Sequence, residues 1–375
     1  MSSTIPTTMK AVVIEGNKPL FKENIPVPKL PKGFMLIKVK AVAGNPTDWK
    51  HCEFQLGPQG SVVGCDASGE VVQLGPDVDP REFKVGDHVF SFVHGSSNFC
   101  PENGAFGEYV AVDTASTFKA SKPLVHATSS TIPSGTVSTW EDTASVPLSF
   151  TTAGASLFHH FKLKMEWEPA QPQRDFPVLV WGGATALGQP LIQLMKQINA
   201  YSKIIVVASK KHEKKLKAFG ADEVFDYHDT DVIEQITSKY NNIQHLYDTV
   251  SIPETTHQVY KCAAKNSSAR VLQYMFMTTK DIDEKIRRDD VSVAGTLIYC
   301  VGEHDVELGG LVFKHDPTYR KIVSQFIKFV QPRLYEGKIK HVDITIYKGG
   351  LQEVPRLLKD IQTGKNSGSK LVATL

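Results

Sequence analysis

The chain has 375 residues, 41% hydrophobic and 22% charged, with a formal net charge of +2 at pH 7. These values are typical of a globular protein of two domains, and so small a charge gives no broad field for nucleic acid or an acidic membrane. The N-terminus has no signal-like segment, no apolar run is long enough to span a bilayer, and the five cysteines are scattered without a C-x-x-C pair. We therefore expect a protein of the cytoplasm, with the nucleus as a further compatible location, that has reduced thiols and no nucleic-acid or membrane partner.

Short alternating apolar segments, broken by Gly, Pro and Asp, occupy the first 150 residues. Such a series predicts an irregular β-barrel or sandwich. The clearest segments are 10–14, 35–42, 69–74, 85–90 and 107–112.

Strand and helix patterns alternate from about 151 to 301, which predicts a doubly wound parallel sheet. The clearest unit is the apolar strand 177–181, a turn of small residues, an apolar helix 191–198 and a second strand 203–208. The turn points the helix N-terminus and free backbone N–H groups at whatever lies above it, which suits a pyrophosphate. Thr185 replaces the middle glycine of a G-x-G-x-x-G pattern, so a plain βα turn without a ligand is the alternative. The candidate cofactor-binding residues are Gly182, Gly183, Ala184, Thr185, Ala186, Leu187 and Gly188.

The end of the second strand bears on the choice of cofactor. A protein that binds NAD usually places an Asp or Glu there, to accept from the ribose hydroxyl. This tip carries Ser209 and Lys211 instead, and Tyr227 follows what resembles a third strand. A hydroxyl and an ammonium suit a 2′-phosphate, so we expect NADPH to bind, with NADH also accepted. The alternative is a solvated basic helix face, because five lysines gather between 210 and 217.

The C-terminal region predicts a helix over 319–330, a strand over 344–347, a helix over 351–361 and a strand over 370–375. The stretch 311–334 resembles an insertion and could line a pocket or mediate assembly.

An ordered set of motifs runs through nearly the whole chain. The motifs lie at 45–50, 64–71, 85–89, 104–109, 147–153, 219–224 and 364–372. The set resembles the medium-chain dehydrogenase/reductases, most closely their zinc-free quinone oxidoreductase and fungal toxD-like (trans-acting enoyl reductase-like) branch. The resemblance implies a GroES-like irregular β-barrel domain of residues 1–150 plus about 311–375, and a Rossmann NAD(P)-binding domain of residues 151–310.

The zinc-dependent relatives of this family have a Cys, a His of a Gly-His-Glu motif and a later Cys or Asp as ligands. The matching positions here are Asn45, the motif Gly64-Cys65-Asp66, and Leu148. Because catalytic zinc needs three N or S ligands, we expect no zinc, and Cys65 to be a small buried side chain.

The resemblance also implies roles for single residues. Asn45 could donate to a substrate oxygen, or its side chain could simply cap a turn. Lys50 is the other candidate catalytic residue, with Asp48 orienting it across a turn. The resemblance also implies cofactor contacts outside the glycine-rich turn: Thr47, Asp48, Trp49 and Lys50, then Thr152 near the nicotinamide, and Lys370 at the pyrophosphate. The alternative for Lys370 is an ordinary lysine on an edge strand.

Three functions are compatible with the sequence. The first is a zinc-independent NAD(P)H-dependent reductase of small aldehydes, α,β-unsaturated carbonyls or quinones, acting in detoxification. The second is an enoyl reductase that serves a polyketide synthase in trans. The third is a non-catalytic NADPH-binding sensor or structural protein. We expect the substrate to be a small carbonyl compound and the protein to be a monomer or a homodimer.

Overall fold

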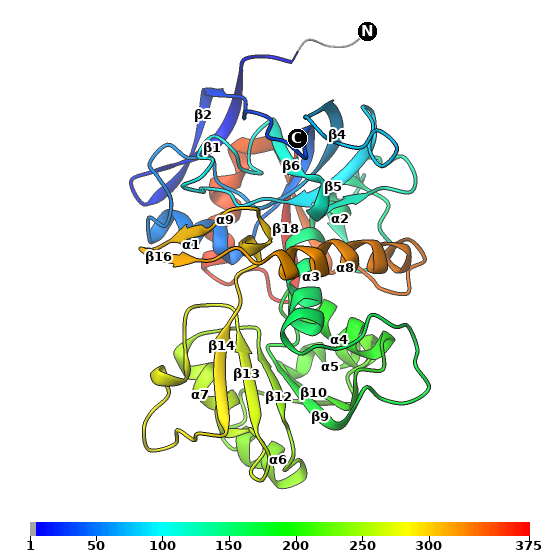
Figure 1. Cartoon of the computed structure of the whole chain (residues 1–375), viewed down its shortest axis with the longest axis vertical. Coiled ribbons are helices and arrows are strands. Elements are labelled where there is room, and N and C mark those ends of the chain that lie inside the picture. The colour runs from blue at the N-terminus through cyan, green and yellow to red at the C-terminus, as the bar shows by residue number, and fades with distance from the viewer. Residues whose placement is uncertain (1–4) are drawn as a thin grey trace. The chain divides into compact units, whose positions relative to one another are not determined.

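The structure is a computed structural model that describes residues 5–375 (Figure 1). The chain forms two units. Unit 1 takes the residues up to Thr151 and Tyr299–Leu375, and unit 2 takes Thr152–Ile298. The first boundary is next to the predicted one at 150/151, and the second lies earlier than the predicted return at 310/311.

Unit 1 is built on an eight-stranded sheet in the order β7-β5-β4-β3-β18-β17-β8, with β6 paired to β3. Most neighbours are antiparallel, but β17 and β18 are parallel. The strand β18 lies between β3 and β17, so this sheet joins strands that are far apart in the sequence. The strands are β1 (Thr8–Glu15), β2 (Lys18–Pro26), β3 (Phe34–Ala43), β4 (Asp66–Leu74), β5 (His88–Phe92), β6 (Tyr109–Asp113), β7 (Thr117–Lys119), β8 (Thr131–Ile132), β15 (Val306–Leu308), β16 (Leu311–Phe313), β17 (Asp343–Lys348) and β18 (Ser369–Thr374).

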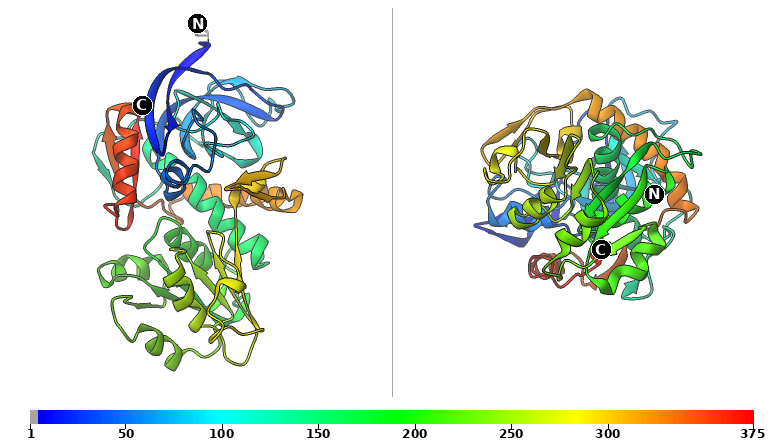
Figure 2. Two further views of the ribbon diagram at one scale, coloured as in Figure 1. Left: turned by 90° about the vertical axis from the view of Figure 1, so that its left-hand side faces the viewer. Right: turned by 90° about the horizontal axis from the view of Figure 1, so that it is seen from below.

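Several helices of unit 1 pack against its strands. Helix α9 buries an apolar face that includes Val354, Leu357 and Leu358 in the main core of the unit. Figure 2 shows α9 beside the N-terminal strands. The helices are α1 (Pro46–Glu53), α2 (Trp140–Ala144), α3 (Pro147–Gly154), α8 (Pro317–Tyr335) and α9 (Val354–Gln362).

The boundary between the units falls inside α3, at Thr151/Thr152, and a π-helical turn over Ala155–His160 follows this helix.

Unit 2 contains a six-stranded sheet in the order β11-β10-β9-β12-β13-β14, and every neighbouring pair is parallel. This confirms the predicted doubly wound sheet. The strand order reverses between β9 and β12, and ligands of such sheets bind beyond the carboxyl ends of the strands at that point. The strands are β9 (Arg174–Trp181), β10 (Tyr201–Val207), β11 (Glu223–Phe225), β12 (His245–Asp248), β13 (Ala269–Gln273) and β14 (Val291–Gly295); the helices are α4 (Gly188–Gln197), α5 (Glu213–Phe219), α6 (Val232–Lys239) and α7 (Pro253–Lys261).

The residues of β9 explain why this sheet forms. Residues 178–181 are all buried, as a central strand requires when both of its faces are covered. Over residues 5–375 no helix has both the length and the apolar character needed to cross a bilayer.

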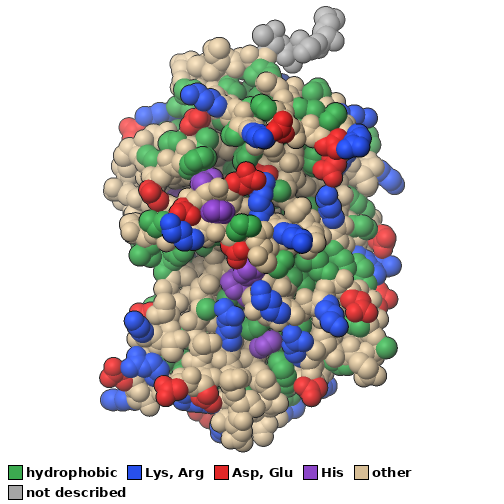
Figure 3. Space-filling model, viewed as in Figure 1, with side chains coloured by type: hydrophobic (Ala, Val, Ile, Leu, Met, Phe, Trp, Pro, Cys, Tyr) green, Lys and Arg blue, Asp and Glu red, His purple; other side chains and the backbone are tan. Residues whose placement is uncertain are grey.

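The surface carries charges of both signs. On the face shown in Figure 3, Lys and Arg are mixed with Asp and Glu rather than gathered into one field. This agrees with the small net charge of the chain.

Candidate functional site

The turn after β9 leaves no room for a side chain at two of its glycines. A Cβ on Gly183 would come within 2.1 Å of Val206 Cγ1, and one on Gly188 within 2.5 Å of the Gly182 carbonyl oxygen. Gly182 itself has a φ of +81°, a conformation that favours glycine. The glycines therefore let the turn, β10 and the start of α4 approach one another closely.

Thr185, which replaces the middle glycine of the pattern, fixes this turn. Its hydroxyl donates to Thr249 Oγ1 at 2.9 Å and accepts from the Gly188 N–H at 2.9 Å. The Thr249 hydroxyl in turn donates to the carbonyl oxygens of Trp181 and Gly182, at 2.8 Å each. Because Thr249 follows β12, these bonds join the two strands at which the sheet order reverses.

Three backbone donors of the turn remain available. The N–H groups of Gly182 and Gly183 both donate to the Val207 carbonyl, whereas those of Ala184, Ala186 and Leu187 meet no acceptor in residues 5–375. These donors lie at the carboxyl edge of the sheet and at the start of a helix of 10 residues. The turn therefore fits the pyrophosphate of a dinucleotide.

The tip of β10 presents the side chains predicted for a 2′-phosphate. Ser209 is half-buried and Lys211 is exposed, whereas Lys210 forms an ion pair with Glu213 at 3.2 Å. Within residues 5–375 Lys211 has no ion-pair partner, so its ammonium is available to an anion. Tyr227 is 50% exposed and packs against the His228 ring, with 4.0 Å between centroids.

A carboxylate at this tip comes from the next strand. Asp226 accepts the Lys210 N–H at 2.8 Å, and its other oxygen accepts from the backbone and imidazole of His228 at 3.0 and 2.6 Å. These bonds hold the pKa of Asp226 down to about 2, with the backbone bond from His228 the largest cause. Asp226 therefore connects the end of β11 to the turn that carries Ser209 and Lys211.

We expect Lys211→Ala to weaken NADPH binding by about 1–3 kcal/mol and to leave NADH binding nearly unchanged, because a charge-assisted hydrogen bond to the 2′-phosphate is lost. Fluorescence titration of both cofactors measures this. Lys214→Ala is the matched control, since it removes an exposed lysine of the same cluster. Equal losses for NADPH and NADH would contradict a contact between Lys211 and the 2′-phosphate.

In unit 1, residues 46–53 form helix α1, where we had expected a turn. The sequence contains the reason, because Pro46 occupies the first helical position and the Asp48 carboxylate accepts the Asn45 N–H at 2.7 Å. Positions i and i+2 of a helix do not face each other, so Asp48 does not orient Lys50 as we had expected. Burial raises the pKa of the Asp48 carboxyl to about 7.

Lys50 and Trp49 lie on the same helix. The Lys50 ammonium is 5.7 Å from the centroid of the Trp49 ring, and burial lowers the pKa of Lys50 from its ordinary value. A lysine of this kind gives up a proton more readily than an exposed one. Thr47 in the same helix is half-buried.

Both the nitrogen and the oxygen of the Asn45 side-chain amide form hydrogen bonds within unit 1. Its Nδ2 donates to the Ala43 carbonyl at 3.3 Å and to Asp66 Oδ2 at 2.9 Å, and its Oδ1 accepts from Lys370 at 2.9 Å. Since an amide has two N–H bonds, none is left for a substrate oxygen, and the predicted catalytic role of Asn45 does not fit this arrangement.

Lys370 is 1% exposed, and its ammonium lies 2.5 Å from Asp66 Oδ2. Its strand β18 is central in the sheet, so the edge-strand alternative is wrong. The structure gives this ammonium a buried carboxylate partner, and contact with a pyrophosphate stays a prediction. The contacts predicted for Trp49 and for Thr152, whose carbonyl accepts from Ser156 at 2.7 Å, also stay predictions.

Two of the positions that match zinc ligands, Asn45 and Leu148, come together around Asp66. Its Oδ1 accepts the Leu148 N–H at 2.7 Å, and its Oδ2 accepts from Asn45 and Lys370. These groups bond to one another, and neither an amide nor a leucine suits zinc. No set of three or more His, Cys, Asp or Glu in residues 5–375 is arranged to hold a metal. The donors therefore do not fit a zinc ion.

Sequence reasoning missed three aromatic residues around Thr47. The Tyr299 hydroxyl lies 3.1 Å from Thr47 Oγ1 and 3.0 Å from Cys65 Sγ. His51 Nδ1 lies 2.8 Å from the Thr47 carbonyl oxygen, and the His94 ring stacks on Tyr299 with 4.0 Å between centroids. His51 could have been found from its i, i+4 spacing to Thr47 on a helix, whereas no local pattern signals Tyr299.

Comparison with known proteins agrees with this architecture. Residues 31–122 match the model of the alcohol dehydrogenase GroES-like domain, and residues 186–308 match that of the zinc-binding dehydrogenases. An uncharacterized protein of Saccharomyces cerevisiae is 53% identical over 100% of both chains. The trans-enoyl reductase caaB of Aspergillus niger is 32% identical over 98% of this chain and 97% of its own. The fold matches the Pseudomonas syringae quinone oxidoreductase with a TM-score of 0.71, at 18% identity over 98% of this chain and 99% of that one.

These matches extend over both units, and the relatives share the chain's whole length. The protein therefore belongs to the medium-chain dehydrogenase/reductase superfamily, in the toxD-like branch that includes the fungal trans-enoyl reductases, and is an oxidoreductase of that family.

Proposed function

We propose that this protein is an NADPH-dependent reductase of small α,β-unsaturated carbonyl compounds that works without zinc. The observation that carries the proposal is the turn after β9, with its unused N–H groups on Ala184, Ala186 and Leu187 and the nearby Ser209 and Lys211 for a 2′-phosphate. When bound, NADPH supplies a hydride to an electrophilic carbon of the substrate.

The residues of unit 1 supply the polar groups that such a reduction needs. Negative charge develops on the substrate oxygen as the hydride arrives, so a nearby donor lowers the barrier. Lys50 has a lowered pKa and Thr47 has a half-buried hydroxyl, and both suit that task. Thr47 and Lys50 are therefore the side chains we assign to the reaction centre.

Purified protein, NADPH and a panel of enals, aldehydes and quinones test the proposal by the loss of NADPH absorbance. We expect the unsaturated compounds to be reduced with the highest kcat/KM. NADPH binding without turnover of any member of the panel would favour a sensor or structural role and contradict the proposal. We further propose that the enzyme acts on a free small molecule in the cytoplasm, as a monomer or homodimer.

The second candidate is an enoyl reductase that acts in trans on a carrier-bound chain. The similarity to caaB over 98% of this chain favours it. The two functions are separated by comparing the reduction of an enoyl thioester on an acyl carrier protein with that of a small free enoyl thioester. Only a trans-acting enzyme prefers the carrier-bound form.

We expect metal chelation to leave the reductase activity intact, because Asn45 and Leu148 occupy positions at which zinc relatives have ligands. Elemental analysis of the purified protein, followed by assays with and without chelator, checks this. About one tightly bound zinc per chain, with activity lost on its removal, would overturn our assignment of these positions.

A further inference from the structure

A line of hydrogen-bonding side chains runs through the interior of unit 1. It begins at the half-buried Thr47, continues at 3.1 Å to the Tyr299 hydroxyl and reaches Cys65 Sγ after another 3.0 Å. Tyr299 is 5% and Cys65 1% exposed, so Thr47 is the member nearest to solvent. A hydroxyl or thiol can accept a hydrogen bond from one neighbour while it donates to the next, so this line can pass a proton along.

The carboxyl of Asp48 lies next to the Cys65 end of this line. Asp48 is 1% exposed, and the Cys65 thiol faces it closely enough to affect its pKa. Its Oδ2 accepts the Asn45 N–H, but its Oδ1 has no hydrogen-bond partner in residues 5–375. A buried carboxylate oxygen without a partner is costly, so this environment favours the protonated carboxyl.

The groups around Asp48 let it exist in both protonation states. Burial raises its pKa, and the charge of Asp66 acts in the same direction; Lys370, the Asn45 N–H and the Cys65 thiol act in the opposite direction. Cys52 and Tyr299 complete the titratable groups that interact with it. With a pKa of about 7, the carboxyl can hold a proton and release it near neutral pH.

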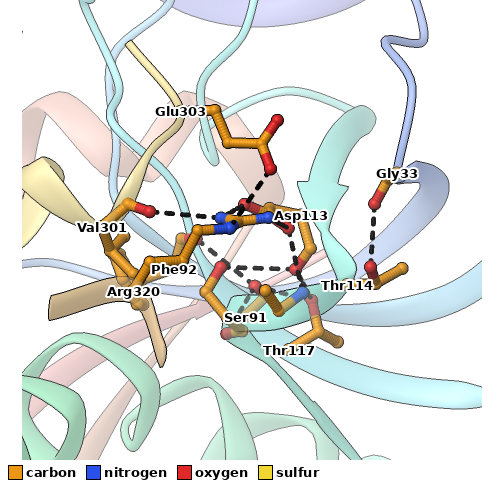
Figure 4. A network of polar contacts seen from close by, with 11 residues as sticks. Gly33, Ser91, Phe92, Asp113, Thr114, Thr117, Val301, Glu303 and Arg320 are labelled. Carbon is orange, nitrogen blue, oxygen red and sulfur yellow. Dashed lines mark hydrogen bonds and ion pairs between the residues drawn. The ribbon is translucent and has the colours of Figure 1, made fainter. Parts of the chain in front are cut away.

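The turn that carries Tyr299 is held firmly in place. Arg320 of α8 donates to the Val301 carbonyl at 3.2 Å, pairs with both oxygens of Asp113 and lies 3.4 Å from Glu303 (Figure 4). The His94 ring stacks on Tyr299 at an interplanar angle of 9°. The position of the hydroxyl is therefore set from two sides.

We propose that Thr47, Tyr299, Cys65 and Asp48 form a proton relay that completes the reduction. This inference rests on the proposed reductase function. Bound NADPH would supply a hydride to the β-carbon of the unsaturated carbonyl, whose C=C π bond would break to leave an enolate. The Thr47 hydroxyl gives its proton to the α-carbon of the enolate and takes the proton of Tyr299. Tyr299 takes that of Cys65, and Cys65 takes that of Asp48, which ends as a carboxylate.

After the product leaves, Thr47 takes up a proton from solvent and the line passes a proton back to Asp48. In this scheme Thr47 is the catalytic residue, and the other three residues act through it.

The first test is Tyr299→Phe, which removes one oxygen from the relay. With but-2-enal as substrate we expect kcat to fall roughly 100-fold while the Kd for NADPH stays unchanged. Tyr335→Phe is the matched control, because that hydroxyl donates to the Lys119 carbonyl at 2.6 Å, away from the relay. Cys65→Ala should also lower kcat, whereas Cys65→Ser, which keeps a group that can donate and accept, should retain most of it.

The second test is the pH profile. Asp48 must be protonated to donate, so kcat of the wild-type protein should fall as the pH rises through about 7. In the Asp48→Asn variant, the new side chain can still accept from the Asn45 N–H but cannot titrate. The variant should therefore have a low kcat that does not fall as the pH rises through about 7.

A wild-type protein that does not reduce but-2-enal or any other enal would refute the proposed function. If the wild-type protein reduces but-2-enal and the Tyr299→Phe variant has the same kcat and the same pH profile, the relay is refuted but the proposed reductase function is not. If Tyr299→Phe does not fold, the two Cys65 variants decide, and equal activity of Cys65→Ala and Cys65→Ser would overturn the relay.

Discussion

Ala186→Asp should abolish NADPH binding while the protein still folds. The Ala186 N–H is one of the three unused donors of the turn, and the residue lies just before α4. A carboxylate there would face the pyrophosphate, and two unit charges about 4 Å apart near a protein surface repel by roughly 4 kcal/mol. That energy corresponds to a loss of nearly a thousandfold in affinity. Folding should survive, because an acidic side chain near a helix N-terminus is favourable.

Nicotinamide fluorescence measures the affinity, and far-UV circular dichroism checks the fold. Ala186→Asn is the matched control, since it adds the same volume without the charge and should lose far less affinity. Wild-type affinity in Ala186→Asp would place the cofactor elsewhere and remove the main support for the reductase proposal.

Lys370→Met should destabilise unit 1 by about 3–5 kcal/mol, the usual cost of removing one partner of a buried ion pair. The variant leaves the Asp66 carboxylate, which is 0% exposed, without its cationic partner. Urea unfolding measures the total effect, and hydrogen exchange of the amides in β3 and β18 assigns it to unit 1.

The double variant Asp66→Asn with Lys370→Met provides the control. It removes both charges, so it should regain part of the lost stability. A Lys370→Met protein as stable as the wild type would mean that the ion pair contributes little to the fold.

Local patterns predicted the first part of the parallel sheet in unit 2 well. The strand, turn and helix over residues 177–198 are adjacent in sequence, and their apolar residues follow the periods of a buried strand and an amphipathic helix. The part played by Thr185 was not predicted, because its hydroxyl bonds to Thr249, which enters the turn from another strand.

The polar interior of unit 1 depends on residues far apart in the chain. Thr47 and Tyr299 are separated by 252 positions, and Asp66 and Lys370 by 304. No local pattern marks such pairs. Helix α1 was missed for a different reason, because Asn45, Pro46 and Asp48 are ordinary signals for the start of a helix and were interpreted as a turn.

The central position of β18 in the sheet affects the order in which the two units can fold during synthesis. A ribosome releases β3 long before β18, and until the last residues emerge β3 lacks one of its neighbours. Unit 2 is continuous in sequence and can fold as soon as it is synthesised, whereas unit 1 cannot be completed before the final strand arrives. A nascent chain halted before residue 369 would therefore carry a complete unit 2 and an unpaired edge on β3 of unit 1, and such an edge is prone to pair with other chains.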